Sequence, residues 1–149
     1  MSALIGIVQT SEVALSAAAQ KTVLQVVAPA NQRLKVLSWG VFFDGTSVTE
    51  APVEIVLQRQ STAGTMSALT PVKNDDSLAE TIQTTAQHTA TAEPTSGDVI
   101  DVVEVHPQQG YEKLYPLGQE PIIGGGDRLA IRCTAPTGVN VRAKIVFEE

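Results

Sequence analysis

The sequence has few of the residues on which cross-linked folds and most catalytic sites depend. One cysteine, Cys133, stands among 149 residues. A single cysteine excludes an internal disulfide framework and any zinc site built from several cysteines. Alternation in the surrounding segment places Cys133 on the inward side of a strand, which predicts a buried and unreactive thiol.

Charged residues are also scarce. They make up 17% of the chain, against the usual ~25% of a globular protein. The ten basic residues are scattered and the net charge is −6. Nucleic acid is therefore not expected as a ligand, because phosphate binding needs clustered Lys and Arg. So little charge favours a surface of Thr, Ser, Gln and Ala, or one covered in a homo-oligomer with closed symmetry.

Long apolar runs are missing as well. No stretch approaches the ~20 consecutive apolar residues of a membrane-spanning helix. Residues 1–10 have no basic segment and only a short apolar run, so they do not match a secretory signal. We therefore expect no membrane partner and synthesis in a cytoplasm.

The sequence consists instead of short β-branched or alternating segments between Gly, Pro, Asn and Asp turns, without a sustained helical period. The predicted strands are residues 13–17, 21–27, 34–44, 53–59, 64–68, 84–92, 99–105, 111–117, 128–134 and 139–147. Because no helices separate them, they favour an all-β antiparallel β-sandwich over an α/β fold. An eight-stranded jelly roll over residues 13–149 fits best, since the Cys and Trp signature of immunoglobulin domains is absent.

Residues 139–147 place their apolar side chains on one face, and two further strands show the same period-2 alternation of a strand with one solvated face. In residues 53–59, Glu54 and Gln58 alternate with apolar positions. In residues 128–134, Ala130 falls on the outward side between two arginines. Both strands are therefore predicted to bury one face and to expose the other.

The large aromatic side chains are concentrated in residues 34–44. This segment holds Trp39, the only Trp, and two of the three Phe, in a chain with 4% aromatic residues. Burying such rings gives a large apolar gain per residue. Apolar residues on both sides of the segment predict a central strand that is covered on both faces.

The N-terminal segment, residues 1–12, is the candidate partner-binding element. Its apolar side chains are Leu4, Ile5, Ile7 and Val8. Such a segment forms either an edge strand docked on its own sheet or an arm that reaches a neighbouring subunit. Self-docking is the commoner use of a chain terminus.

The two histidines offer little support for a metal site. His106 has Glu104 two residues before it, but a site needs three or four ligands, and a residue preceding a proline at a strand edge is the simpler interpretation. His88 lies in a Thr/Ala strand and is predicted to be a hydrogen-bonded surface residue. The absence of a His-x-His pair argues against a cupin-like enzyme.

No other motif predicts catalysis or a cofactor. There is no Gly-x-Ser-x-Gly motif, and the glycines of residues 124–127 lack the Lys-Ser/Thr of a P-loop, so a turn or bulge is expected there. The aspartates at 75, 76, 98 and 101 do not match the spacing of a calcium loop and are predicted to lie in solvated turns. We therefore expect a non-enzymatic protein without cofactor or metal.

Tyr111 and Tyr115 share one side of a predicted strand. With Trp39 they would form a stacking platform for a sugar, although strand aromatics more often fill a core or an interface. Together with the polar loop at residues 69–81, they motivate an alternative function as a receptor- or glycan-binding module.

Four segments carry a resemblance to known proteins. They are LKVLSWGVFFDG at 34–45, QSTAGTMSALTPV at 60–72, TTAQHTATAEP at 84–94, and the tail from 116 to 149 containing PLGQEPIIGGGDRLAIRCTAP. Together they resemble small virion proteins of tailed bacteriophages and prophages, over most of the chain from Leu34 onward.

The resemblance implies a capsid decoration (cement) protein. Such a protein is a homotrimer that binds the major capsid protein on the outer surface of the head and ties neighbouring capsomers together. The alternative within the same setting is the receptor- or glycan-binding module of a phage fibre.

Overall fold

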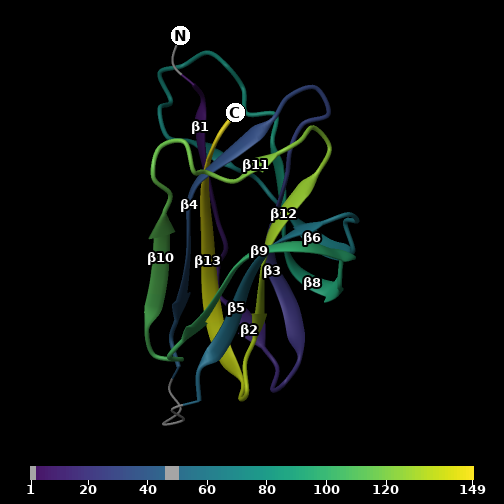
Figure 1. The fold of residues 1–149 in the computed structure, drawn as a ribbon, viewed down its shortest axis with the longest axis vertical. Coiled ribbons are helices and arrows are strands. Elements are labelled where there is room, and N and C mark those ends of the chain that lie inside the picture. The colour runs from purple at the N-terminus through teal and green to yellow at the C-terminus, as the bar shows by residue number, and fades with distance from the viewer. Residues whose placement is uncertain (1–2, 46–50) are drawn as a thin grey trace.

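The computed structural model describes residues 3–45 and 51–149. Residues 1–2 of the N-terminal segment lie outside this part of the chain. The fold is all-β, with two antiparallel sheets packed face to face and no helix among the described residues (Figure 1). The strands are β1 Ile5–Gln9, β2 Val13–Leu15, β3 Gln20–Val27, β4 Leu34–Phe43, β5 Val53–Gln60, β6 Thr65–Leu69, β7 Val72–Lys73, β8 Thr85–Ala92, β9 Ser96–Val105, β10 Gly110–Leu114, β11 Ile122–Ile123, β12 Arg128–Thr134 and β13 Val139–Glu148.

The strand order confirms the predicted β-sandwich with jelly-roll-like topology. Sheet 1 has the order β10-β4-β13-β1-β7, with β11 paired to β4 and β2 to β13; sheet 2 has the order β6-β8-β3-β12-β5-β9. Without the short strands and the β6–β8 segment, the sheets are β10-β4-β13-β1 and β9-β5-β12-β3. The chain alternates between them as in two interleaved Greek keys, which is the jelly-roll arrangement.

Residues 61–95 form an insertion between β5 and β9 that widens both sheets on the same side. β8 pairs with β3 and β6 pairs with β8, which extends sheet 2. β7 pairs with β1 through Ile7 and Val72, which extends sheet 1. The insertion therefore connects the two layers at the margin formed by β1 and β3.

β4 lies between β13 and β10 at the centre of sheet 1, and Trp39 is fully buried. The predicted role of residues 34–44 in the core is thus confirmed. The prediction that both faces are covered is wrong, because Phe42 is 41% exposed on the outer face of sheet 1, where no further layer of described residues lies. An added Cβ on Gly40 or Gly110 would contact the Phe42 ring, so this ring lies flat over two glycines.

The outer face of sheet 2 also differs from its prediction. Gln58 and Ala130 are buried, although alternation placed them on a solvated face. The neighbouring buried amides bond to one another: Gln25 Nε2 donates to Gln60 Oε1 at 2.6 Å, and Gln60 Nε2 donates to Thr22 Oγ1 at 2.9 Å. Buried polar groups are retained when they are hydrogen-bonded, and the partners lie too far apart in sequence for alternation to reveal them.

Candidate functional site

The histidines and acidic residues considered as metal ligands do not come together. His106 Nδ1 accepts a hydrogen bond from the Gln108 backbone N–H at 3.2 Å in the turn between β9 and β10. His88 lies on β8, with Nδ1 2.9 Å from Thr89 Oγ1. Within residues 3–45 and 51–149, no group of three or more His, Cys, Asp or Glu side chains is placed to hold a metal ion.

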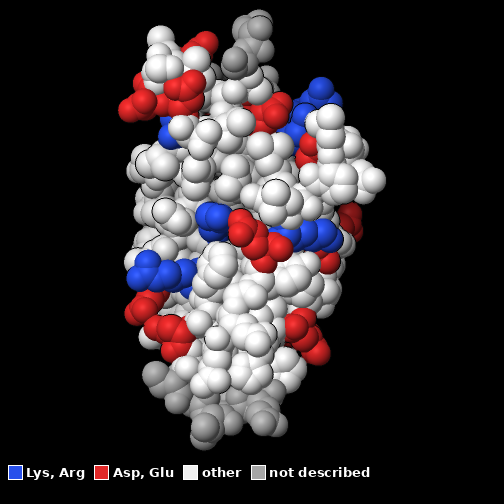
Figure 2. Space-filling view, turned by 90° about the vertical axis from the view of Figure 1, so that its left-hand side faces the viewer, with Lys and Arg blue, Asp and Glu red and all other residues white. Residues whose placement is uncertain are grey.

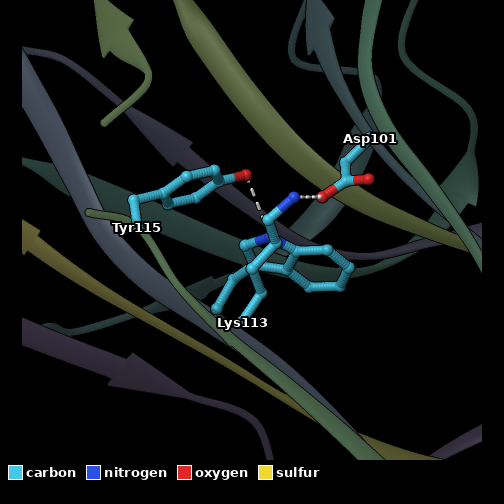
Figure 3. Close-up of polar contacts among 4 residues, drawn as sticks. Asp101, Lys113 and Tyr115 are labelled. Atoms are coloured by element: carbon cyan, nitrogen blue, oxygen red, sulfur yellow. Dashed lines mark hydrogen bonds and ion pairs between the residues drawn. The ribbon is translucent and has the colours of Figure 1, made fainter. Parts of the chain in front are cut away.

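The two tyrosines pack against the aromatic core, and Figure 3 shows Tyr115. The rings of Trp39 and Tyr111 have centroids 5.4 Å apart, and Trp39 Nε1 donates to the Tyr115 hydroxyl at 3.2 Å. Burial raises the pKa of Tyr115 above its ordinary value. Both residues are half-buried, and they close the core where β10 meets β9.

An ion pair joins the two sheets at the same place. Lys113 Nζ lies 2.6 Å from Asp101 Oδ2 and 5.2 Å from the centroid of the Tyr115 ring (Figure 3). The hydrogen bond to Asp101 raises the pKa of Lys113. This arrangement serves the closure of the sandwich, since each polar group already has a partner within the chain.

The outer face of sheet 1 carries the most distinctive surface pattern. The pairings Val72 to Ile7, Ile7 to Val146, Val146 to Ser38 and Ser38 to Leu114 run in register across β7, β1, β13, β4 and β10. Side chains at paired positions of neighbouring strands point to the same face. We call these five residues the apolar row, in which serine is the one polar member.

A β-bulge adds to the apolar row at its centre. The β4–β13 register shifts so that Ser38 pairs with Val146 and Val36 with Phe147, which leaves Leu37 as the extra residue. Leu37 is half-buried, and its carbonyl accepts a hydrogen bond from the Tyr115 backbone N–H at 3.0 Å. Bulges commonly redirect side chains at functional surfaces.

Ion pairs border the apolar row on both sides. Lys35 and Glu148 pair at 3.5 Å, and Lys144 and Glu112 pair at 2.9 Å. The second pair spans β4 at Gly40, the residue that lies between them in the register and has no side chain in the way. Both lysines are thereby neutralised within the chain. Seen from the β10 side, a wide uncharged area lies above a charged band across the middle (Figure 2).

Several apolar side chains of this face are open to solvent. Leu114 is 73% exposed and Val72 57%, at opposite ends of the apolar row, and Ile122 is exposed beside Lys35. Between them Ile7 and Val146 are half-buried and Ser38 is buried, so the exposed apolar surface lies mainly at the two ends of the row. Exposed apolar surface bordered by polar residues is typical of an interaction site. The face can bind a flat, largely uncharged partner, but it offers no group placed for catalysis among the described residues.

The N-terminal candidates divide between the core and this face. β1 lies between β13 and β7, and the backbones of Leu4 and Glu149 exchange hydrogen bonds of 3.3 and 2.9 Å. Leu4 and Val8 are buried in the core of their own chain. Ile5 and Ile7 are half-buried on the outer face, with Ile7 in the apolar row.

Leu114, Val72 and Val146 are surface candidates that the sequence did not predict. Each is unremarkable in its own segment, and the row exists only through the pairing of five strands, which a single sequence does not reveal. The sequence does offer a signal for Val146, because alternation in residues 139–147 places this position on the face opposite the buried side chains.

The fold and this surface define a jelly-roll β-sandwich whose outer face carries an apolar row bordered by ion pairs. Comparison with known protein families, with curated proteins and with solved structures finds no match to the chain. In the part of the chain that the structure describes, no helix is long and apolar enough to cross a membrane.

Proposed function

We propose that the protein is a non-enzymatic bacteriophage capsid decoration (cement) protein that binds the outer surface of the head and stabilises it. The observation that carries the proposal is the apolar row across the outer face of sheet 1. The resemblance of the four segments to phage virion proteins supports the same function. The major capsid protein is the proposed partner and the capsid surface the proposed location.

The composition of the face suits attachment to a shell. The lysines beside the apolar row already pair with glutamates of the same chain, so docking on the row leaves neither lysine unpaired. Exposed ion pairs contribute only about 0–1 kcal/mol each. Burial of the apolar row therefore supplies the main favourable term.

The free energies of burial and association favour binding by several linked copies over binding by one copy. Fully burying a side chain such as Val72 or Leu114 contributes roughly 1.5–3 kcal/mol, whereas association costs an estimated ~4–15 kcal/mol. One copy would bind weakly, but a homotrimer would engage three sites with high effective concentration. Light scattering coupled to size exclusion should give about three times the 15.7 kDa chain mass; a clean monomer at micromolar concentration would contradict the trimer.

The function is tested by adding the purified protein to undecorated capsids. Co-sedimentation and a higher thermal rupture temperature are expected, because a ligand at a hundredfold excess over its Kd stabilises each site by ~2.7 kcal/mol. Leu114→Asp should abolish both effects. Val102→Asp is the matched control, since Val102 is 53% exposed on β9 of the other sheet.

Absence of binding by the wild-type protein would refute the proposal, and equal loss in both variants would refute the assignment to sheet 1. The alternative of a receptor- or glycan-binding fibre module gains no support from Tyr111 and Tyr115, whose rings pack toward Trp39. Glycan-array binding that is lost on Tyr115→Ala would favour that alternative.

A further inference from the structure

The insertion forms a groove at the margin where both sheets end. Residues 68–73 pass from β6 to β7, and residues 81–86 return toward β8. Between them lies a groove of about 640 Å³, within the ~300–1,000 Å³ typical of ligand sites. The capsid-binding proposal does not require this groove.

The walls of the groove are mainly apolar. The principal lining side chains are Ala68, Leu69, Pro71, Val72, Ile82 and Ala86. Leu69 and Ile82 also pack against the hydrophobic core, and this contact holds their part of the groove in place. Val72 is 57% exposed and also belongs to the apolar row, so the groove is continuous with the outer face of sheet 1.

The charges at the groove favour a basic occupant. Lys73, the one cation among the described lining residues, donates to the carbonyls of Leu78 at 2.6 Å and Glu80 at 3.2 Å. Asp76 also lines the groove, and the adjoining loop carries Glu80 and Asp75, whose carboxylate accepts hydrogen bonds from Ser77. A fatty acid would need a free cation for its carboxylate, and Lys73 is committed to holding the loop.

Two strand edges border the groove. β6 ends sheet 2 and β7 ends sheet 1, and neither has a further strand beyond it in the described part of the chain. Such edges present unpaired backbone groups that an extended peptide can join, with its alternate side chains entering pockets. The groove therefore offers apolar contacts and backbone pairing together.

We propose that this groove binds an extended peptide segment with apolar side chains at alternate positions and a flanking Lys or Arg. The apolar side chains occupy the space between residues 68–73 and 81–86. The basic residue faces the carboxylates of the 74–81 loop.

The probe is the blocked peptide Lys-Val-Thr-Val-Thr-Val-Lys, titrated into the isotope-labelled full chain and followed by amide chemical shifts. Shifts should concentrate at residues 68–86. The counterpart with Glu for both Lys should bind at least about tenfold more weakly, and the counterpart with Pro for both Thr should not bind, since Pro cannot donate to a strand.

Substitutions inside and outside the groove test whether the peptide binds there. Ala68→Phe fills the groove and should weaken the Lys peptide at least about tenfold. Ala92→Phe, at an exposed alanine of β8 outside the groove, is the matched control. Leu114→Asp should leave peptide binding unchanged, so loss of capsid binding and loss of peptide binding are separable.

Three results would overturn the proposal. One is the absence of shifts at residues 68–86 with the Lys peptide. Another is equal binding of the Lys and Glu peptides. The third is that dodecanoate produces these shifts while none of the peptides does, which would assign the groove to an acyl chain.

Discussion

Trp39 shows how one core side chain reaches the edge of sheet 1 at β10. It is fully buried, packs against Tyr111 with the ring planes tilted by 51°, and donates its indole N–H to Tyr115. The sequence could predict its burial, because aromatic residues are few and clustered around it. It could not predict the contact with Tyr115, since the two residues are 76 positions apart.

Trp39→Ala should lower the free energy of unfolding by about 3–5 kcal/mol, because the cavity removes most contacts of the largest core side chain. Tyr115→Phe removes only the hydroxyl and should cost about 0.5–1.5 kcal/mol. Urea denaturation followed by circular dichroism measures both. If Trp39→Ala kept wild-type stability but lost capsid binding, Trp39 would belong to an interface and not to the core.

Glu12 provides a pH-dependent contribution at the residue scale. Its hydrogen bond to Asp44 and the charge of Asp44 raise the pKa of Glu12, and Arg142 partly offsets this. A carboxyl group with a raised pKa in the folded state binds its proton more tightly there than in the unfolded chain. Protonation of Glu12 therefore stabilises the folded state at pH values below the unfolded-state pKa of this group. The stabilisation is lost as the pH rises through the folded-state pKa.

Glu12→Gln should therefore raise the melting temperature at neutral pH, where the wild-type carboxylates repel each other. Well below the ordinary carboxyl pKa the variant and the wild type should melt alike. Thermal melts across this range test the direction, with Glu80→Gln on the distant insertion loop as control. A melting temperature lowered by Glu12→Gln at neutral pH would contradict the assigned repulsion.

At the scale of elements, local pattern predicted strands far better than it predicted their partners. The strand at residues 128–134 has the predicted bounds, because its alternation and its flanking Gly and Pro turns are local signals. The two residues of β7 fall in a segment expected to be a polar loop, since their strand character comes from pairing with β1. The apolar row and the buried glutamines depend on such pairings and were therefore not predictable.

The pairing of β4 with β10 depends on the space that Gly110 leaves for Phe42. A Cβ at Gly110 would lie 2.5 Å from the Phe42 ring. Gly110→Ala should therefore destabilise the fold by about 1–3 kcal/mol, as overpacking does. In a Phe42→Ala background the same change should cost much less stability, because the effects of substitutions at contacting residues are not additive. Equal costs in both backgrounds, measured by urea denaturation, would refute this contact.

At the scale of the whole molecule, the insertion and the outer face of sheet 1 provide two different proposed binding surfaces. The eight jelly-roll strands build one core and present most of the apolar row, while residues 61–95 extend the edges of both sheets and add a groove. Because Val72 belongs to both surfaces, a partner that occupies one can contact the other. The separation of Leu114 from Ala68 makes the two activities independently removable.

The rate at which Cys133 is labelled can report whether the two sheets unfold cooperatively. It is fully buried on β12, between β3 and β5, and burial raises the pKa of its thiol. Labelling by a thiol reagent should therefore require opening of the central strands and follow global unfolding. Trp39→Ala, on the opposite sheet, should accelerate labelling by about 10²–10⁴-fold, as its lost stability enlarges the open population. Rapid labelling of the wild type without denaturant, or no acceleration in Trp39→Ala, would show that sheet 2 opens independently of sheet 1.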